Sequence, residues 1–369
     1  MASPHEKTPA PALKEMFDAA RFRQVARELT LIDPAFDAGR FLKCALHGLD
    51  ALSLMQRLRR MTESLHATLP ADFHEALERL RLLAPKIDKS FVTLVLPDFV
   101  GCYGLHEFEA SMAALKFFTV FGSSEFAIRE FLRMDQTRTL NVMRQWSLDE
   151  NEHVRRLASE GCRPRLPWSF QLLSLVADPR PVLPILENLK ADPSLYVRKS
   201  VANHLNDITK THPEWVLELL RSWPLENLHT AWIARHALRS LIKQGHPGAL
   251  SLIGATGKAQ VTQPMLTLRP DQLGLGGSFT LCLELQSASE HTQRLVVDYA
   301  VHYVKKSGTA SAKVFKWKEL NLNPGETVLL SRRQTIRNLT TRIHYPGWHR
   351  LEILINGETL AETGFTLNG

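Results

Sequence analysis

Apolar residues recur at helical spacing through the first two thirds of the chain. In the segment 36–61 they fall three and four residues apart, as at Phe41, Ala45, Leu49 and Leu52. This spacing places them on one face of an α-helix. We therefore expect residues 1–257 to be helical almost throughout.

Three helical segments resemble one another: ENEHVRRLASEG (150–161), SLYVRKSVANHLND (194–207) and AWIARHALRSLIK (231–243). Aligning Val154, Val197 and Ile233 gives spacings of 43 and 36 residues. These spacings are close to the length of a HEAT-type helical hairpin, which stacks on its neighbours into a curved solenoid. The pattern predicts a HEAT-like α-helical solenoid over residues 1–257.

The hydrophobic period changes near residue 258. Beyond it apolar and polar residues alternate, as in SFTLCLELQS (278–287), and turn signals such as Asn356-Gly357 separate the runs. Alternation with turns predicts antiparallel strands, and residues 258–369 have the length of an immunoglobulin-like β-sandwich. The predicted fold class is therefore multidomain, α then β, with the solenoid at 1–257 and the sandwich at 258–369.

The charge of the chain favours a polyanionic partner such as nucleic acid, because the net charge is +7 and the pI about 9.3. Within 305–342 there are nine lysines and arginines against two acids. This stretch predicts either contact with a DNA backbone or an edge that lysines keep soluble. The candidates for DNA contact there are Lys305, Lys306, Lys316 and Trp317, the last with packing in the sandwich core as the competing interpretation.

Other features argue against several protein classes. No two of the four cysteines have CxxC spacing and no histidine cluster accompanies them, so we expect neither disulfides nor a metal site. The N-terminus lacks the apolar run of a signal peptide, and the most apolar stretch, 91–100, is too short to span a bilayer. We expect a cytoplasmic protein without a membrane segment, and a monomer, since no heptad pattern suggests self-association.

Several runs resemble one family: SVANHLND (200–207), WIARHALRSLIKQGHPGAL (232–250) and PGWHRLEILINGETLAETGF (346–365). They are similar to the AlkC branch of the HEAT-like alkylpurine DNA glycosylases, in the subgroup with a C-terminal immunoglobulin-like domain. The resemblance implies excision of cationic alkylated bases (3-methylcytosine, 1-methyladenine, 3-methyladenine) from double-stranded DNA in base excision repair. It also implies no cofactor, and recognition without flipping the base into a deep pocket.

The resemblance implies catalytic roles for Glu125, Glu160, Asp207 and Trp168. Glu160 also stands at an expected helix C-terminus, where a carboxylate faces the negative end of the helix dipole, and such a cost is a mild sign of function. The competing interpretation is that such acids are ordinary solvated charges and that Trp168 packs between hairpins. Carboxylates suit a cationic base and an oxocarbenium-like sugar, and a tryptophan face adds cation–π attraction. We expect Asp207 to position the attacking water and the glutamates to stabilise positive charge.

A basic frame around these acids would hold the DNA. Its candidate residues are Arg155, Arg156, Arg163, Arg165, Arg198, Lys199, Asn203 and Arg235. Some of these are expected to form only the polar face of solenoid helices. No lysine stands out as a Schiff-base nucleophile, so we predict a monofunctional glycosylase without lyase activity. The alternative function is a non-enzymatic HEAT-repeat scaffold, or a damaged-DNA-binding protein with a docking β-domain.

Overall fold

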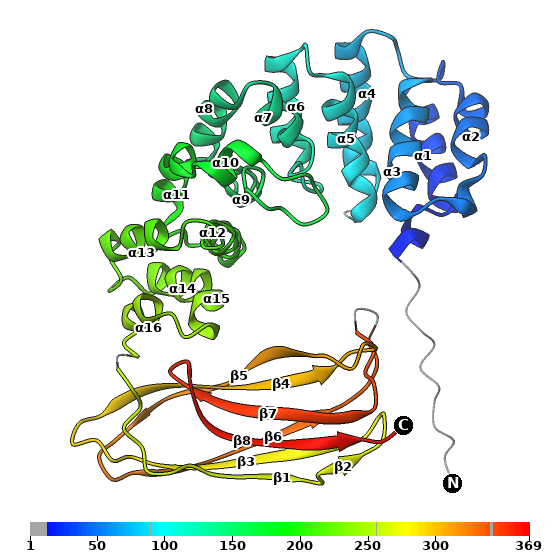
Figure 1. The fold of residues 1–369 in the computed structure, drawn as a ribbon. Coiled ribbons are helices and arrows are strands. Elements are labelled where there is room, and N and C mark those ends of the chain that lie inside the picture. The colour runs from blue at the N-terminus through cyan, green and yellow to red at the C-terminus, as the bar shows by residue number, and fades with distance from the viewer. Residues whose placement is uncertain (1–12, 89, 256, 340–341) are drawn as a thin grey trace. The chain divides into compact units, whose positions relative to one another are not determined.

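The computed structural model describes residues 13–88, 90–255, 257–339 and 342–369. Helices occupy the chain as far as Leu252, and strands follow from Met265 (Figure 1). The predicted α-then-β fold class is therefore confirmed. Packing divides the chain into two compact units. The first runs to Thr211 and includes Glu226–Ile233, and the second comprises His212–Leu225 and Ala234–Gly369.

The first unit is a stack of short helices that pack mainly on their neighbours in the chain. Several begin at an aspartate whose side chain accepts a hydrogen bond from the backbone N–H three residues later, as Asp18, Asp72 and Asp135 do. The α-helices of this unit are α1 (Ala19–Ile32), α2 (Ala38–Leu46), α3 (Leu54–His66), α4 (Phe73–Leu83), α5 (Val95–Tyr103), α6 (Phe108–Phe118), α7 (Ile128–Met134), α8 (Gln136–Trp146), α9 (Glu152–Glu160), α10 (Leu173–Ala177), α11 (Leu183–Leu189) and α12 (Leu195–Ile208). Short 3-10 turns lie at Leu13–Phe17, Leu49–Ala51, Ala84–Lys86, Phe91–Leu94 and Arg180–Val182.

The repeat seen in the sequence corresponds to helices α9, α12 and α14 (Leu228–Ala237). Val154, Val197 and Ile233, the residues used to align the copies, are all buried. Helices α9 and α12 pack directly against each other. The first two copies are therefore packed helices, as a helical-hairpin repeat requires, whereas the third copy is divided between α14 and α15 (Arg239–Lys243).

The last helices pack with the β-domain in the second unit. They are α13 (Pro213–Ser222), α15 (Arg239–Lys243) and α16 (Pro247–Leu252), with the end of α14. Gly245, after α15, and Gly357, in the last strand turn, approach backbone to backbone: a Cβ on Gly245 would lie 2.8 Å from the Cα of Gly357. Both glycines also have positive φ, so neither position suits another residue. The change from helix to strand lies between Leu252 and Met265, but the division in packing falls earlier.

The β-domain is a two-sheet sandwich. Its strands are β1 (Met265–Arg269), β2 (Gln272–Leu273), β3 (Ser278–Gln286), β4 (Gln293–Val304), β5 (Ala310–Leu322), β6 (Thr327–Thr335), β7 (Gly347–Ile355) and β8 (Glu358–Leu367). One sheet has the order β1-β3-β6 and the other β2-β8-β7-β4-β5. All neighbours pair antiparallel except β2 and β8.

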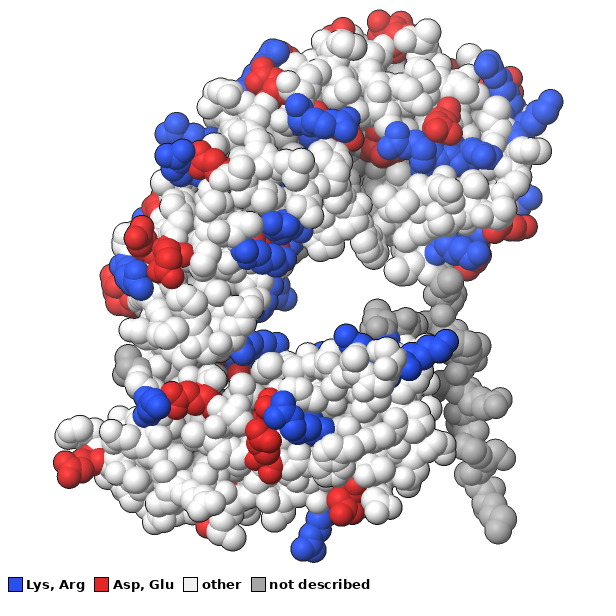
Figure 2. Space-filling view, in the orientation of Figure 1, with Lys and Arg blue, Asp and Glu red and all other residues white. Residues whose placement is uncertain are grey.

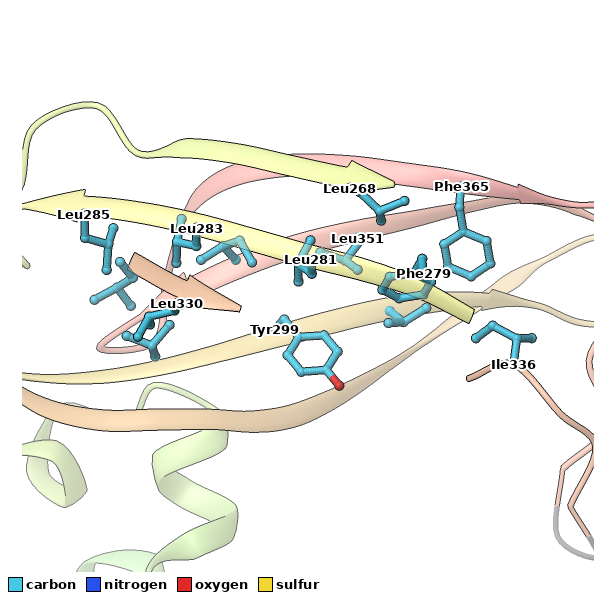
Figure 3. Close-up of a cluster of buried hydrophobic side chains, with 14 of the residues drawn as sticks. Leu268, Phe279, Leu281, Leu283, Leu285, Tyr299, Leu330, Ile336, Leu351 and Phe365 are labelled. Carbon is cyan, nitrogen blue, oxygen red and sulfur yellow. The ribbon is translucent and has the colours of Figure 1, made fainter. Parts of the chain in front are cut away.

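The core lies between these sheets. Alternate residues of β3, namely Phe279, Leu281, Leu283 and Leu285, point inward with the buried side chains of the facing sheet (Figure 3). This is the period-two pattern that the sequence shows over 278–287. Within the described residues no helix is long and apolar enough to cross a membrane.

Candidate active site

An open pocket of ≈ 480 Å³ lies in the first unit, against α9 and the segments before α7 and after α9. Two of the predicted acids, Glu125 and Glu160, line it together with Trp168. The remaining lining side chains are mainly aromatic, cationic or small: Ser90, Phe91, Leu94, Gly122, Ser123, Phe126, Arg156, Arg163, Leu166, Pro167 and Tyr196. The structure therefore brings together three of the four residues to which the sequence assigned catalysis.

Glu125 precedes α7, and its side chain is held from two sides. Ser123 Oγ donates to Glu125 Oε2 at 2.8 Å, and Arg156 of α9 forms an ion pair with the same oxygen. Arg156 also donates to Ser123 Oγ at 2.8 Å, which closes a small ring of contacts. These contacts fix the direction of the Glu125 carboxylate, and its side chain is 14% exposed.

Acids and cations alternate across the site. Arg156 reaches from Glu125 to Glu160, with Nη2 3.5 Å from Oε1, one helical turn along α9. Arg163 then bridges Glu160 at 2.6 Å and Asp207 of α12 at 2.9 Å. Each carboxylate has a cation beside it, and this pairing offsets the cost of burying the charge.

The arginines keep their charge for the same reason. Burial opposes ionisation of Arg156 and Arg163, but the carboxylates beside them outweigh it and raise the pKa of both guanidinium groups. Arg156 also lies over the ring of Tyr196, 5.0 Å from its centroid. The pocket wall is therefore a network of ion pairs, one of whose arginines packs on the ring of Tyr196.

Asp207 stands behind this wall rather than in it. Its side chain is 5% exposed and it is not among the lining residues of the pocket. Arg163 contacts its Oδ2, and Lys210, half exposed on the next turn, contacts Oδ1 at 3.2 Å. Solvent therefore reaches this carboxylate most directly beside Lys210.

Trp168 sits in the loop after α9 in an uncommon backbone conformation. Its φ is +66°, in the left-handed region, which costs a non-glycine residue about 1–2 kcal/mol. Its side chain is not packed between hairpins: the residue is 64% exposed, and the ring meets Phe91 edge-on at 5.9 Å. An exposed indole held in a strained conformation is more consistent with binding than with core packing.

Arg129 of α7 holds that loop, and sequence reasoning missed it. The side chain is fully buried and donates to the carbonyls of Gly161 at 3.0 Å, Arg163 at 2.7 Å and Phe170 at 2.5 Å. Burial lowers its pKa to about 10, so it remains a cation at neutral pH. These bonds fix both ends of the segment that carries Trp168. The sequence carries no signal for it, because α7 also carries Glu130 and Arg133 and Arg129 looks there like an ordinary surface charge.

His204 lies beneath the same network, between α9 and α12. The ring is buried, with Nδ1 3.0 Å from the carbonyl oxygen of Ser159. Burial, and next the charge of Arg163, lower its pKa to about 3, so the ring is neutral at neutral pH. It braces the end of α9 that carries Glu160.

Apart from Arg156 and Arg163, which line the pocket, the predicted DNA-contacting residues of the helical region fall into two groups. Arg155 and Arg198 occupy equivalent places in successive repeats, and each donates at 2.9 Å to the carbonyl of the aspartate six residues before it, Asp149 and Asp192. Arg155 also pairs with the Asp192 carboxylate at 2.7 Å, and Arg235, in the second unit, with Glu319. These three guanidinium groups thus brace the protein itself.

The second group is closer to solvent. Lys199 is exposed, Asn203 is half-buried, and Arg165 donates to Gln171 at 3.0 Å beside the pocket loop. On the face shown in Figure 2, lysine and arginine side chains gather at the inner edge of the helices, near α9 and α12.

The predicted contacts of the β-domain also separate. Lys305 and Lys306 are exposed in the hairpin after β4, whereas Lys316 pairs with Glu319. Trp317 is half-buried against the sandwich core and meets Tyr299 edge-on at 5.8 Å. Its environment is that of a packing residue. Within the described ranges, no group of three or more His, Cys, Asp or Glu side chains is placed to hold a metal ion.

Comparison with known proteins matches both parts of the chain. Residues 109–241 match the family described as "DNA alkylation repair enzyme", and residues 262–369 the family described as "Uncharacterised protein YhaZ, C-terminal Ig-like domain". The YhaZ protein of Bacillus subtilis (strain 168) is 43% identical over 347 residues, which is 94% of this chain and 96% of that protein.

One solved structure is similar over almost the whole chain. It is Pseudomonas fluorescens alkylpurine DNA glycosylase AlkC bound to DNA containing an abasic site analog, with 56% sequence identity and a TM-score of 0.95. The match covers 97% of this chain and 100% of that one. The resemblance noted in the sequence is thereby confirmed, and the chain belongs to the AlkC family of alkylpurine DNA glycosylases.

Proposed function

We propose that this protein is a monofunctional DNA glycosylase that acts in the cytoplasm on cationic alkylated bases in double-stranded DNA, as the first step of base excision repair. Its substrates would be lesions such as 3-methylcytosine, 1-methyladenine and 3-methyladenine. Its similarity to AlkC, whose structure contains DNA with an abasic site analog, supports this function.

The observation that carries the proposal is the composition of the pocket. Glu125 and Glu160 supply carboxylate oxygens, whose charge Arg156 and Arg163 balance, and Trp168 supplies an exposed aromatic face that favours a flat cation over a neutral base. A cation–π contact contributes about 0.5–2 kcal/mol, so Trp168 would give preference rather than absolute selection. The pocket is open to solvent, which suits a base that remains within the duplex stack.

The reaction needs no proton donor at the leaving group, because a cationic base leaves as a neutral molecule. Water forms a bond to C1′ while the C1′–N bond breaks, and the bonding electron pair leaves with the base, which becomes neutral. The water loses a proton to a carboxylate, and the sugar passes through an oxocarbenium-like state that nearby negative charge stabilises. We assign the charge-stabilising role to Glu125 and Glu160 and the water to Asp207, which solvent approaches beside Lys210.

The direct test is excision from a duplex that contains one 3-methylcytosine, followed by alkali to reveal abasic sites. We expect strand breaks after alkali and none before it, because no lyase step is proposed. Binding without abasic sites above the spontaneous rate would instead favour the non-enzymatic, damaged-DNA-binding alternative.

The role of Asp207 is tested by Asp207→Asn against Asp192→Asn. Both aspartates are almost fully buried and paired with an arginine, but the partner of Asp207, Arg163, lines the pocket, whereas the partner of Asp192, Arg155, does not. We expect Asp207→Asn to lower the single-turnover excision rate by ~10² or more, with DNA affinity little changed. Asp192→Asn should lose comparable stability and little rate. Equal rate losses in the two variants would make Asp207 a folding residue.

A further inference from the structure

The loop between α9 and α10 is tied across by its own backbone, and Trp168 lies within both ties. Leu172 donates a backbone hydrogen bond to the carbonyl of Pro164 at 3.1 Å, and Ser169 donates to that of Leu166 at 3.3 Å. The backbone of Trp168 is strained, with a φ of +66°. Such a conformation persists only where the surrounding contacts over-determine it, so the loop needs a further support.

Arg129 of α7 gives that support on both sides of Trp168. Its Nη1 donates to the carbonyls of Gly161 and Arg163, where the loop begins, at 3.0 and 2.7 Å. Its Nη2 donates at 2.5 Å to the carbonyl of Phe170, two residues after Trp168. The guanidinium group also lies over the Phe170 ring, 5.3 Å from its centroid. Because Arg129 is fully buried, water does not compete for these hydrogen bonds.

The arrangement requires an arginine rather than any cation. A guanidinium group spreads its donors over separate nitrogens in a rigid plane, whereas a lysine carries all its donors on one atom. A lysine at position 129 would still place a positive charge beside the carbonyl of Gly161, at the negative end of the α9 dipole. It could not serve the beginning of the loop and Phe170 in the same way. Arg129→Lys therefore separates the charge from the clamp.

We propose that Arg129 is a positioning residue for base excision, which acts by holding the indole of Trp168 at the wall of the pocket. Arg129 does not line the pocket, whereas Trp168 does. The proposal rests on the proposed function, because a fixed indole assists the reaction through its cation–π contact with the alkylated base. An indole that is already in place need not be ordered when the DNA binds, so its contact is not offset by a loss of entropy.

The first test follows the indole itself and needs no substrate. The full chain is labelled with 5-fluorotryptophan, which gives one fluorine NMR signal for each of the seven tryptophans, and Trp168→Phe identifies the signal of Trp168. We expect Arg129→Lys to shift and narrow that signal, because the released loop moves faster, and to leave the other signals in place. If Arg129→Lys does not fold, Phe170→Gly loosens the same end of the loop and keeps the buried cation. A Trp168 signal that stays unchanged in the variant that folds would overturn the proposal.

The second test asks whether the effect on excision passes through the indole. Trp168→Ala should slow single-turnover excision of 3-methylcytosine by about 2- to 30-fold, the range expected for one cation–π contact. Arg129→Lys should slow it by no more than Trp168→Ala does. Adding Arg129→Lys to Trp168→Ala should slow excision no further, because the side chain that Arg129 positions is already gone. Effects that multiply in the double variant would overturn the proposal and make Arg129 a purely structural residue.

Arg57→Lys is the matched control. Arg57 of α3 is 2% exposed and donates to the carbonyls of Lys14 and Phe17 at 3.1 and 3.3 Å, but it lies outside the pocket and the Trp168 loop. This variant should keep the Trp168 signal and the excision rate of the wild type, and an equal shift of the signal here would overturn the proposal. A wild type that excises no 3-methylcytosine would overturn the proposed function, while the NMR signal would still decide whether Arg129 holds Trp168.

Discussion

Removal of Arg163 is the most informative single change to the site. Its side chain is 9% exposed and bridges Glu160 and Asp207, which are 7% and 5% exposed. Replacing it by methionine preserves much of the volume but leaves two buried carboxylates without this partner. Breaking a buried ion pair in this way costs about 3–5 kcal/mol.

That cost converts into a large thermal shift. Each kcal/mol lowers Tm by roughly 2–4 °C in a domain of 150–250 residues, so Arg163→Met should lower Tm by about 6–20 °C in differential scanning calorimetry. Arg180→Met is the matched control, since Arg180 also pairs with an aspartate at 2.8 Å but is 76% exposed. Solvent screens an exposed pair, so the pair contributes little to stability and this variant should melt close to the wild type.

Neutral replacements of the two carboxylates should compensate for the lost arginine. If the loss comes from unpaired carboxylates, then adding Glu160→Gln and Asp207→Asn to Arg163→Met should restore part of the Tm, because neutral amides need no cation. An Arg163→Met variant that melts within the error of Arg180→Met, or a further fall in Tm when the amides are added, would refute this account of the ion pair.

The remaining predictions concern the loop tryptophan and two buried titratable groups. Trp168→Gly should be more stable than Trp168→Ala by about 1 kcal/mol in urea denaturation, because glycine adopts a φ of +66° freely, while both should lose preference for cationic lesions in excision assays. Burial raises the pKa of Asp298 from 3.8 to about 6, so the folded state holds a proton that the unfolded chain has lost. Stability should therefore fall by ~2 kcal/mol as pH rises from 4 to 6, and Asp298→Asn should remove that slope in chemical denaturation across pH. The pKa of His204 is lowered from 6.5 to about 3, so its contribution should be lost as pH falls through that window. His204→Asn, which can still donate to Ser159, should unfold at lower pH than the wild type in circular dichroism, and an unchanged acid midpoint would contradict the assignment.

Periodicity was enough to predict the fold, because hydrophobic spacing reports directly which face of an element is buried. It was not enough to separate adjacent arginines. Arg155 and Arg156 follow each other, yet a helix turns by about 100° per residue, so one faces Asp192 and the other lines the pocket. The sequence predicted both as DNA contacts because it does not show which way each side chain points.

Residues that act through distant backbone are harder to predict. Arg129 binds carbonyls more than 30 residues away, and any residue type supplies a carbonyl, so no pattern marks its partners. Charge counting has the same weakness in the β-domain. Counting charges identified the basic stretch. It could not show that Lys316 forms an ion pair with Glu319, or that Arg333 and Arg337 have no acidic partner among the described residues.

The backbone contact between Gly245 and Gly357 has a consequence for limited proteolysis. Lys258 lies between the helices and the strands, and its side chain is 84% exposed, so trypsin should cut there readily. The cut would not free the β-domain, because Gly245 packs on Gly357 and Arg235 pairs with Glu319 across the join. The nicked protein should elute from a sizing column as one species and separate into two fragments only in denaturant.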